Sequence, residues 1–453
     1  MLGDGEMIKD TEVAAVPIDG DRYHDPHHAR VEADHIWRKS WLLAALESDL
    51  QKPKSTVTFD IGHDSIIIAR ASDGTLHAYH NACTHRGTRL LEEGVSSTPL
   101  ITCPYHAWCF NLDGRLRGAP DPDSFAEGLP ADRLRLKPVQ LDTWQGFVFV
   151  NMDPDAEPLS DFLGRMVERA APYPIAKMDL IEDQTVSVEC NWKAMIDNFS
   201  ELYHVDHIHP QHKRFVDCPN ATDELFENGH TGLHVPGFVT DSRYPVPDRP
   251  TDYQEMQLTA LGIDAQEFVG RVAEIPAAIT RAKREQSGRN GYDYSALSDE
   301  QLTTVFQYNL FPNIILSGSP EGLWMMRSRP HPDDPSQSYL DKWTLQLNPD
   351  PALGGGSEHK QTMHAASGNS EIADGRVARD CFGHEAILSG AKSMTETIDQ
   401  DISLLARVQA GARSSGFDHA WLSDQEIRVA HFHDVLNETY RAAGLLEETK
   451  LLP

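Results

Sequence analysis

The chain has 453 residues, of which 40% are hydrophobic and 24% are charged. This composition is typical of a folded globular protein and excludes a disordered chain. The net charge of −29 argues against nucleic acid as a partner, because an acidic surface repels phosphate groups. No apolar run approaches the ~20 residues of a membrane span. We therefore expect no membrane insertion.

Cysteine usage indicates the compartment. Six cysteines in a chain of this length are too few for a disulfide framework. The N-terminus also lacks a basic region followed by an apolar stretch, so no secretory signal is expected. We expect a cytoplasmic location, where thiols stay free or bind metal.

The first third of the chain carries strand patterns. Residues 31–43 predict a short amphipathic helix, which belongs to an N-terminal arm and helix over 1–41. Short alternating or apolar runs follow, with Asp-Gly turn signals between them. The clearest of these runs are 55–62, 65–70, 75–80 and 147–152. Residues 42–155 are therefore expected to form a small all-β domain.

The remainder, 156–453, mixes strand patterns with longer helical periodicities. The helices are expected at 192–205, 253–272, 394–413 and 424–443. The expected fold class is α+β, with a small all-β domain followed by a larger domain in which helices accompany a sheet.

Two short clusters in the β domain offer metal ligands. Cys83 and His85 are followed, after 17 intervening residues, by Cys103 and His106. Thiolates suit zinc or iron–sulfur clusters, and imidazole suits several metals. Zinc and a [2Fe–2S] cluster with two histidine ligands are the competing interpretations. A zinc finger usually pairs Cys with Cys and His with His, whereas each cluster here holds one of each. That arrangement favours the iron–sulfur interpretation.

The sequences around these residues, CTHRG and CPYHAW, resemble the Rieske domain. The resemblance implies that Cys83, His85, Cys103 and His106 hold a [2Fe–2S] cluster. The sequence departs from the family at Ala107, where many relatives have Gly. This difference affects no ligand.

A second group of candidate ligands lies in NWKAMIDNFSELYHVDHIHP, which begins at Asn191. Glu201 and His204 are i, i+3 neighbours that share one face of a helix. His209 lies about 140° further round a regular helix, so the helix must distort or end before it can join His204 at one ion. From the residues alone, His207 is an equally good partner for His204.

The third ligand of a two-histidine, one-carboxylate iron site would come from a distant helix. Asp401 lies on an apolar stripe formed by Met394, Ile398, Leu405 and Val408. A carboxylate on such a stripe should be paired or bind metal. Asp399 lies on the more polar face. Asp401 is therefore favoured, with ordinary ion pairing as the alternative.

Both groups of ligands, in this order, resemble the α-subunit of Rieske non-haem iron ring-hydroxylating oxygenases, from about residue 25 to about residue 440. The resemblance implies a helix-grip catalytic domain in which His204, His209 and Asp401 bind a mononuclear Fe(II). It also implies that Glu201 is the acidic bridge to the Rieske cluster of a neighbouring protomer. Many relatives have Asp there.

The implied function is the oxygenase component of a multicomponent system. Such a protein uses O2 and electrons from a separate NAD(P)H-dependent reductase, with or without a ferredoxin, to hydroxylate an aromatic or other apolar cyclic substrate in aromatic hydrocarbon catabolism. Oxidative demethylation or quaternary-amine oxidation is the alternative reaction. A Rieske electron carrier and a zinc-stabilised ligand-binding protein are remote alternatives. A homotrimer is expected, with or without a small β-subunit.

Overall fold

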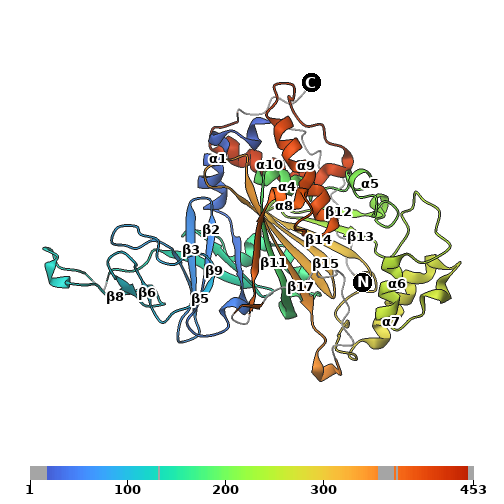
Figure 1. Cartoon of the computed structure of the whole chain (residues 1–453), viewed down its shortest axis with the longest axis horizontal. Helices are drawn as coiled ribbons and strands as arrows, with labels where there is room; N and C mark the ends of the chain where they lie inside the picture. Colours follow the sequence, from blue (N-terminus) through green and yellow to red (C-terminus); the bar gives the residue numbers. More distant parts are fainter. Residues whose placement is uncertain (1–17, 131–132, 356–371, 374–375, 447–453) are drawn as a thin grey trace. The chain divides into compact units, whose positions relative to one another are not determined.

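The computed structural model describes residues 18–130, 133–355, 372–373 and 376–446 (Figure 1). The chain divides into two compact units. We call Arg30–Phe162 the β unit. We call the chain up to Ala29, together with everything from Leu163 onwards, the α+β unit. The sequence analysis places the first domain boundary after residue 41. In the structure, the described segment 18–29 belongs to the α+β unit.

The β unit is built on two antiparallel sheets within its described residues. The larger sheet has the order β1-β10-β9-β4-β3-β2-β5, and the smaller has the order β6-β7-β8. Its strands are β1 (Leu42–Leu46), β2 (Ser55–Ile61), β3 (Asp64–Arg70), β4 (Leu76–His80), β5 (Val95–Ser97), β6 (Ile101–Thr102), β7 (Cys109–Phe110), β8 (Leu116–Gly118), β9 (Pro138–Trp144) and β10 (Phe147–Asn151).

The helix expected at 31–43 begins and ends earlier than the pattern suggested. Helix α1 (Pro26–Glu32) continues as a π-helical turn over Ala33–Trp37, and β1 then begins at Leu42. All five residues of LLAAL are buried in β1. A continuous apolar run of this length fits a buried strand as well as a helix, which is why the end was misplaced.

The α+β unit contains a sheet with the order β12-β13-β14-β15-β16-β17-β11-β20 in its described part. Neighbouring strands are antiparallel except β11 and β20, which are parallel. The strands are β11 (Met178–Val188), β12 (Thr222–Leu225), β13 (Thr231–Val235), β14 (Val305–Leu310), β15 (Ile314–Ser319), β16 (Gly322–Pro330), β17 (Ser338–Leu347) and β20 (Arg379–Gly383), with a separate ribbon of β18 (Ile372–Ala373) and β19 (Arg376–Val377).

Helices pack against this sheet, as Figure 1 shows for α4, α8 and α9. The helices are α2 (Leu159–Leu163), α3 (Met166–Ala170), α4 (Trp192–Asn198), α5 (Val205–Ile208), α6 (Asp252–Ala260), α7 (Ile275–Gln286), α8 (His384–Leu388), α9 (Glu396–Ala412) and α10 (Ile427–Ala442). The last two confirm the helices expected near 394–413 and 424–443. The helix expected over 253–272 was too long, because α6 stops just before Gly262, which has φ +74°. Glycine favours this conformation after a helix end.

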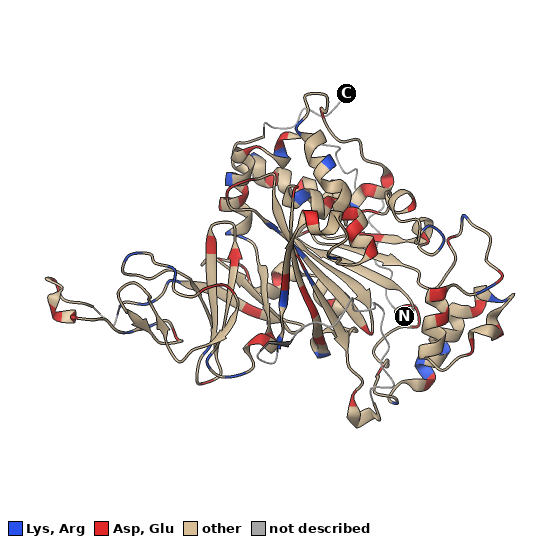
Figure 2. Ribbon diagram, viewed as in Figure 1, with Lys and Arg blue, Asp and Glu red and all other residues tan. Residues whose placement is uncertain are grey.

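Acidic side chains are spread over both units (Figure 2). None of the described helices has the length and apolar character needed to cross a membrane.

Candidate metal centres

The two Cys/His clusters of the β unit fold into equivalent loops. In each loop the cysteine N–H donates to the carbonyl five residues on, Cys83 to Thr88 and Cys103 to Trp108, both at 2.8 Å. Each cysteine carbonyl also accepts from the N–H four residues on, at 2.8 and 3.0 Å. The sequence thus builds two matching loops, which we call prongs, the first between β4 and β5 and the second between β6 and β7.

The candidate ligands of the two prongs differ in their exposure to solvent. Both thiols are buried, Cys83 at 3% and Cys103 at 2% exposure, whereas both histidines are partly exposed. Burial raises the pKa of Cys83. At Cys103 burial acts in the same direction, but the N–H groups of Tyr105 and His106 outweigh it and lower that pKa. Amide groups that favour a thiolate are suited to a metal-bound sulfur.

The two imidazoles also lie together. The His85 and His106 ring centroids are 4.8 Å apart, and the His85 ring stacks on Trp108 at 4.8 Å. The Nδ1 atom of His85 is buried without a hydrogen-bond partner. Such an atom is costly unless something else binds it. A buried thiol pair beside an imidazole pair with an orphaned nitrogen fits a cluster held by two cysteines and two histidines.

The backbone of Ala107 is strained, whereas that of Gly87, at the same place in the other prong, is not. Ala107 has φ +53°, and Gly87 has φ +75°. The left-handed region costs a non-glycine residue about 1–2 kcal/mol, against about 0.5–1 kcal/mol for the greater entropy loss of glycine. We therefore expect Ala107→Gly to stabilise the β unit by about 0.5–1 kcal/mol.

Chemical denaturation, monitored through the loss of the cluster's visible absorbance, measures this gain in stability. Ala82→Gly, just before the other prong at a position where φ is not positive, is the matched control and should destabilise the β unit. Equal losses in the two variants would contradict the strain assigned to Ala107.

In the α+β unit, the ligand-bearing segment breaks out of helical geometry. Asn191 caps α4 through a side-chain bond to the N–H of Lys193, and α4 ends at Asn198. Glu201 therefore lies in a loop, which corrects the expectation that it shares a helix face with His204. His204 precedes the short helix α5, and His209 follows it with φ −116° and ψ 71°. The helix ends at His209, as the spacing required.

Helix α9 supplies Asp401, which is 1% exposed. The buried stripe of α9 consists of Ile398, Asp401, Ile402, Leu405 and Gln409. Val408, which was expected on this stripe, is 54% exposed. The stripe follows the 3.6-residue period more closely than the sequence interpretation assumed.

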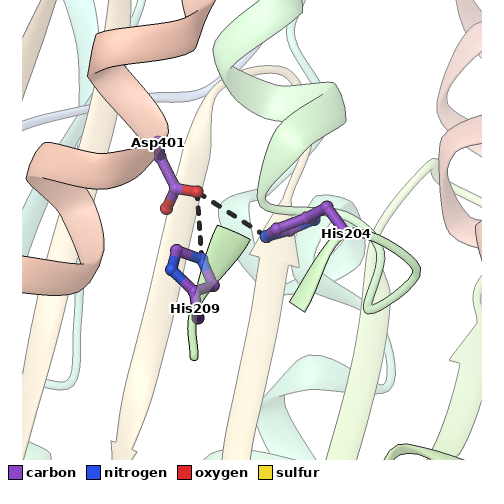
Figure 3. Close-up of side chains that lie close together, drawn as sticks. All are labelled: His204, His209 and Asp401. Atoms are coloured by element: carbon purple, nitrogen blue, oxygen red, sulfur yellow. Dashed lines mark ion pairs between the residues drawn. The ribbon is translucent and has the colours of Figure 1, made fainter. Parts of the chain in front are cut away.

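The structure brings His204, His209 and Asp401 together (Figure 3). One possible ligand atom from each lies within 4.8 Å of the other two. The Asp401 Oδ1 atom is 3.1 Å from His209 Nε2 and 3.6 Å from His204 Nε2. Both imidazoles thus turn the same nitrogen towards one carboxylate oxygen.

The opposite nitrogen of each imidazole is anchored. His204 Nδ1 contacts the Glu201 carboxylate, which also accepts the His204 N–H at 3.1 Å. His209 Nδ1 bonds to Gln400 Oε1 at 2.7 Å. When Nδ1–H donates in this way, the Nε2 lone pair is free for a metal. Gln400 was not identified from the sequence, because its role depends on a contact between segments 191 residues apart.

The electrostatics of this centre attract positive charge. Burial by itself lowers the pKa of His209, but the Asp401 carboxylate and Gln400 reverse the effect, and the pKa is raised. Asp401 Oδ1 is buried and accepts no hydrogen bond. A buried carboxylate oxygen between two imidazoles therefore fits a divalent cation.

The two rival residues lie elsewhere. His207 is exposed and outside the cluster. The Asp399 carboxylate is used at the start of α9, where it accepts from the Met394 N–H at 2.9 Å and from the Ser393 hydroxyl. A helix start is a favourable place for a carboxylate.

Comparison with known families shows which family the chain belongs to. Residues 40–138 match the Rieske [2Fe-2S] domain, and residues 175–442 match the ring hydroxylating alpha subunit (catalytic domain). The second match covers more than half of the chain. The chain therefore belongs to the family of Rieske ring-hydroxylating oxygenase α-subunits. This family combines a [2Fe–2S] cluster with a mononuclear iron and receives electrons from a partner reductase.

The relatives differ in substrate. The chain is 38% identical over 191 residues to the carnitine monooxygenase oxygenase subunit of Escherichia coli (strain K12), covering 42% of this chain and 50% of that one. It is 32% identical over 236 residues to the anthranilate 1,2-dioxygenase large subunit of Acinetobacter baylyi, covering 49% of each chain. The chain thus aligns with about half the length of these relatives.

Among solved structures, the fold resembles that of a quaternary ammonium Rieske monooxygenase described with reference to carnitine oxidation by gut microbiota and inter-subunit electron transfer. The TM-score is 0.65 at 19% identity, over 93% of this chain and 95% of that one. This likeness shows the shared fold.

Proposed function

We propose that this chain is the oxygenase component of a Rieske monooxygenase that oxidises a small quaternary ammonium compound. The observation that carries the oxygenase part of the proposal is the meeting of His204, His209 and Asp401 at one buried point. Two histidines and one carboxylate leave coordination positions open, which is the donor set of non-haem Fe(II) oxygenases.

The residues divide the work between the two centres. Cys83, Cys103, His85 and His106 would hold the cluster, and the triad would hold the iron. When bound, the cluster passes single electrons and the open iron site activates dioxygen. Glu201 and Gln400 fix the tautomers of the two triad imidazoles, so that both Nε2 atoms are preset for metal.

Glu201 has a further proposed role as the acidic link between this centre and the cluster of a neighbouring subunit. Its carboxylate already contacts His204. The relative described with inter-subunit electron transfer supports the idea that this family works across subunits. A homotrimer, a ferredoxin or reductase as electron donor, a small β-subunit as an optional companion and a cytoplasmic location remain predictions.

Two observations favour a quaternary ammonium substrate over the aromatic ring first expected. The sequence identity over the aligned residues is higher with the carnitine relative, at 38%, than with the anthranilate relative, at 32%. The net charge of −29 also creates a field that concentrates cations at the protein surface. Aromatic ring hydroxylation is the second candidate, and the anthranilate relative favours it.

The proposed reaction balances as a monooxygenation. One oxygen atom of O2 enters a C–H bond next to the quaternary nitrogen, and the other leaves as water. Two electrons come from NAD(P)H, and two protons are consumed. The hydroxylated carbon then forms a carbonyl as its C–N bond breaks. The hydroxyl proton is released to solvent, and the tertiary amine leaves with the electron pair of the C–N bond.

A single-turnover experiment tests the substrate class. The full chain, loaded with iron and chemically reduced, is mixed with O2 and either L-carnitine, other quaternary ammonium compounds or anthranilate. We expect up to one tertiary amine released per chain from a quaternary compound, measured by mass spectrometry, and no ring-hydroxylated product. If only anthranilate gives a product, the substrate class is aromatic and the protein is still an oxygenase. A colourless protein with stoichiometric zinc would refute the oxygenase itself.

A further inference from the structure

The segment 18–29 inserts two side chains into the α+β unit. Arg22 is 1% exposed and Tyr23 is partly buried. The segment also approaches the end of α9 closely at Gly20, where an added Cβ would lie 2.1 Å from the Ala412 carbonyl oxygen. Only glycine fits there. Such close packing holds this segment firmly against α9.

The Tyr23 hydroxyl reaches α4. It donates to Asp197 Oδ2 at 2.6 Å, and His433 of α10 contacts the other oxygen, Oδ1, through Nε2 at 2.9 Å. Arg22 can only donate, so its bond to His433 Nδ1 at 2.9 Å makes that nitrogen the acceptor. His433 is therefore protonated at Nε2 and donates to Asp197. Asp197 is thus held by two donors from different segments.

The backbone of Tyr23 reaches α9. Its carbonyl accepts from Gln409 Nε2 at 3.0 Å, and Gln409 Oε1 accepts the N–H of Asn191 at 2.7 Å. Asn191 is the residue that caps α4. One amide side chain therefore joins the start of α4 to α9, and Tyr23 joins α9 to the end of α4.

These two helices deliver the metal ligands. Asp401 lies on α9, two turns before Gln409, and the ligands His204 and His209 follow α4. A metal site tolerates misplacement of its ligands of only about 0.5 Å. The position of α4 relative to α9 must therefore be fixed as closely as the ligands themselves.

We propose that Tyr23, together with Asp197 and Gln409, forms a clamp that positions the His204–His209–Asp401 site for its metal. The Tyr23 clamp, as we call these three residues, touches neither the metal nor a ligand. It acts by holding α4 and α9 in register. The inference rests on the proposed metal site, but it is independent of the substrate.

Cobalt binding separates this role from simple stabilisation. The full chain, with its Rieske cluster in place and the mononuclear metal removed by a mild chelator, is titrated with Co(II) at 10 °C and followed by visible absorption. We expect Tyr23→Phe to raise the Kd for Co(II) roughly 3- to 10-fold, less than the ~10- to 100-fold typical of residues bonded directly to a ligand. The Rieske absorption should not change.

Tyr308→Phe is the matched control. Tyr308 is 1% exposed in the same unit, lies on β14, and makes only a long hydroxyl bond of 3.4 Å to the Arg169 carbonyl. We expect its Co(II) affinity to equal that of the wild type. Gln409→Met is the second test variant, because it removes both bonds of the amide at similar volume and should weaken Co(II) in the same direction.

The outcomes are distinct. Unchanged Co(II) affinity in Tyr23→Phe and Gln409→Met, with a lowered melting temperature alone, would overturn the clamp and leave a purely structural role. If Tyr23→Phe does not fold, Gln409→Met decides the matter. If the wild type binds no Co(II), or binds it equally after Asp401→Ala, the metal site itself is wrong.

Discussion

Asp401→Ala is expected to empty the mononuclear site and abolish turnover while leaving the Rieske absorption spectrum intact. The Asp401 Oδ1 atom is the one that both imidazoles face, at 3.1 and 3.6 Å. Its removal takes away the only carboxylate of the described cluster and leaves two neutral donors. We expect metal affinity to fall by more than the ~100-fold seen when a ligand's partner is lost. Iron analysis should drop from about three irons per chain to about two, because the cluster retains its pair.

Asp399→Ala is the matched control for this variant. Asp399 lies in the first turn of the same helix, and its carboxylate accepts the N–H of Met394, which lies just before the helix. The loss of such a hydrogen bond costs about 1 kcal/mol of stability. We expect a slightly less stable protein that keeps all of its iron. Loss of iron from Asp399→Ala, with retention in Asp401→Ala, would reverse the assignment.

Glu201→Gln is expected to keep both metal centres and still stop efficient turnover. The single carbonyl oxygen of glutamine can still accept the Nδ1–H of His204, so the imidazole keeps its orientation, while the bond that the second carboxylate oxygen accepts from the His204 N–H is lost. What is also lost is the charge that the proposed link between subunits needs. We expect turnover to fall roughly 10- to 100-fold. In rapid mixing, the reduced cluster should reoxidise correspondingly slowly.

The same measurement distinguishes the alternatives for Glu201. Near-wild-type reoxidation would make it an ordinary carboxylate that only orients His204. Loss of mononuclear iron with an intact Rieske spectrum would make it a metal ligand. Iron analysis together with rapid-mixing spectroscopy on this one variant separates the three cases.

The candidate cysteine and histidine ligands could be predicted from the sequence because they lie in short motifs with distinctive spacing. Asp401 could be predicted because it is a carboxylate among apolar residues of a helix. The end of the helix before His209 followed from the same spacing, since a regular helix cannot aim both histidines at one ion. The loop position of Glu201 did not follow, because an E-x-x-H pattern fits a helix equally well.

The supporting contacts could not be predicted in this way. Gln400 meets His209, and Tyr23 meets Asp197, across separations of 191 and 174 residues. No periodicity in a single sequence reports such a pair. Each is an ordinary polar residue until the tertiary structure gives it a partner. The candidate ligands could thus be proposed from the sequence, and the residues that contact and position them could not.

The Tyr23 clamp also bears on the order in which the chain folds during synthesis. The β unit is complete once residue 162 has been made, so it can fold while the rest of the chain is still being translated. Tyr23 is made first, yet the His433 that shares Asp197 with it comes 410 residues later. At about 5–20 residues per second, the segment 18–29 waits tens of seconds for its site. We therefore expect the segment 18–29 to finish docking late, after α10 has left the ribosome.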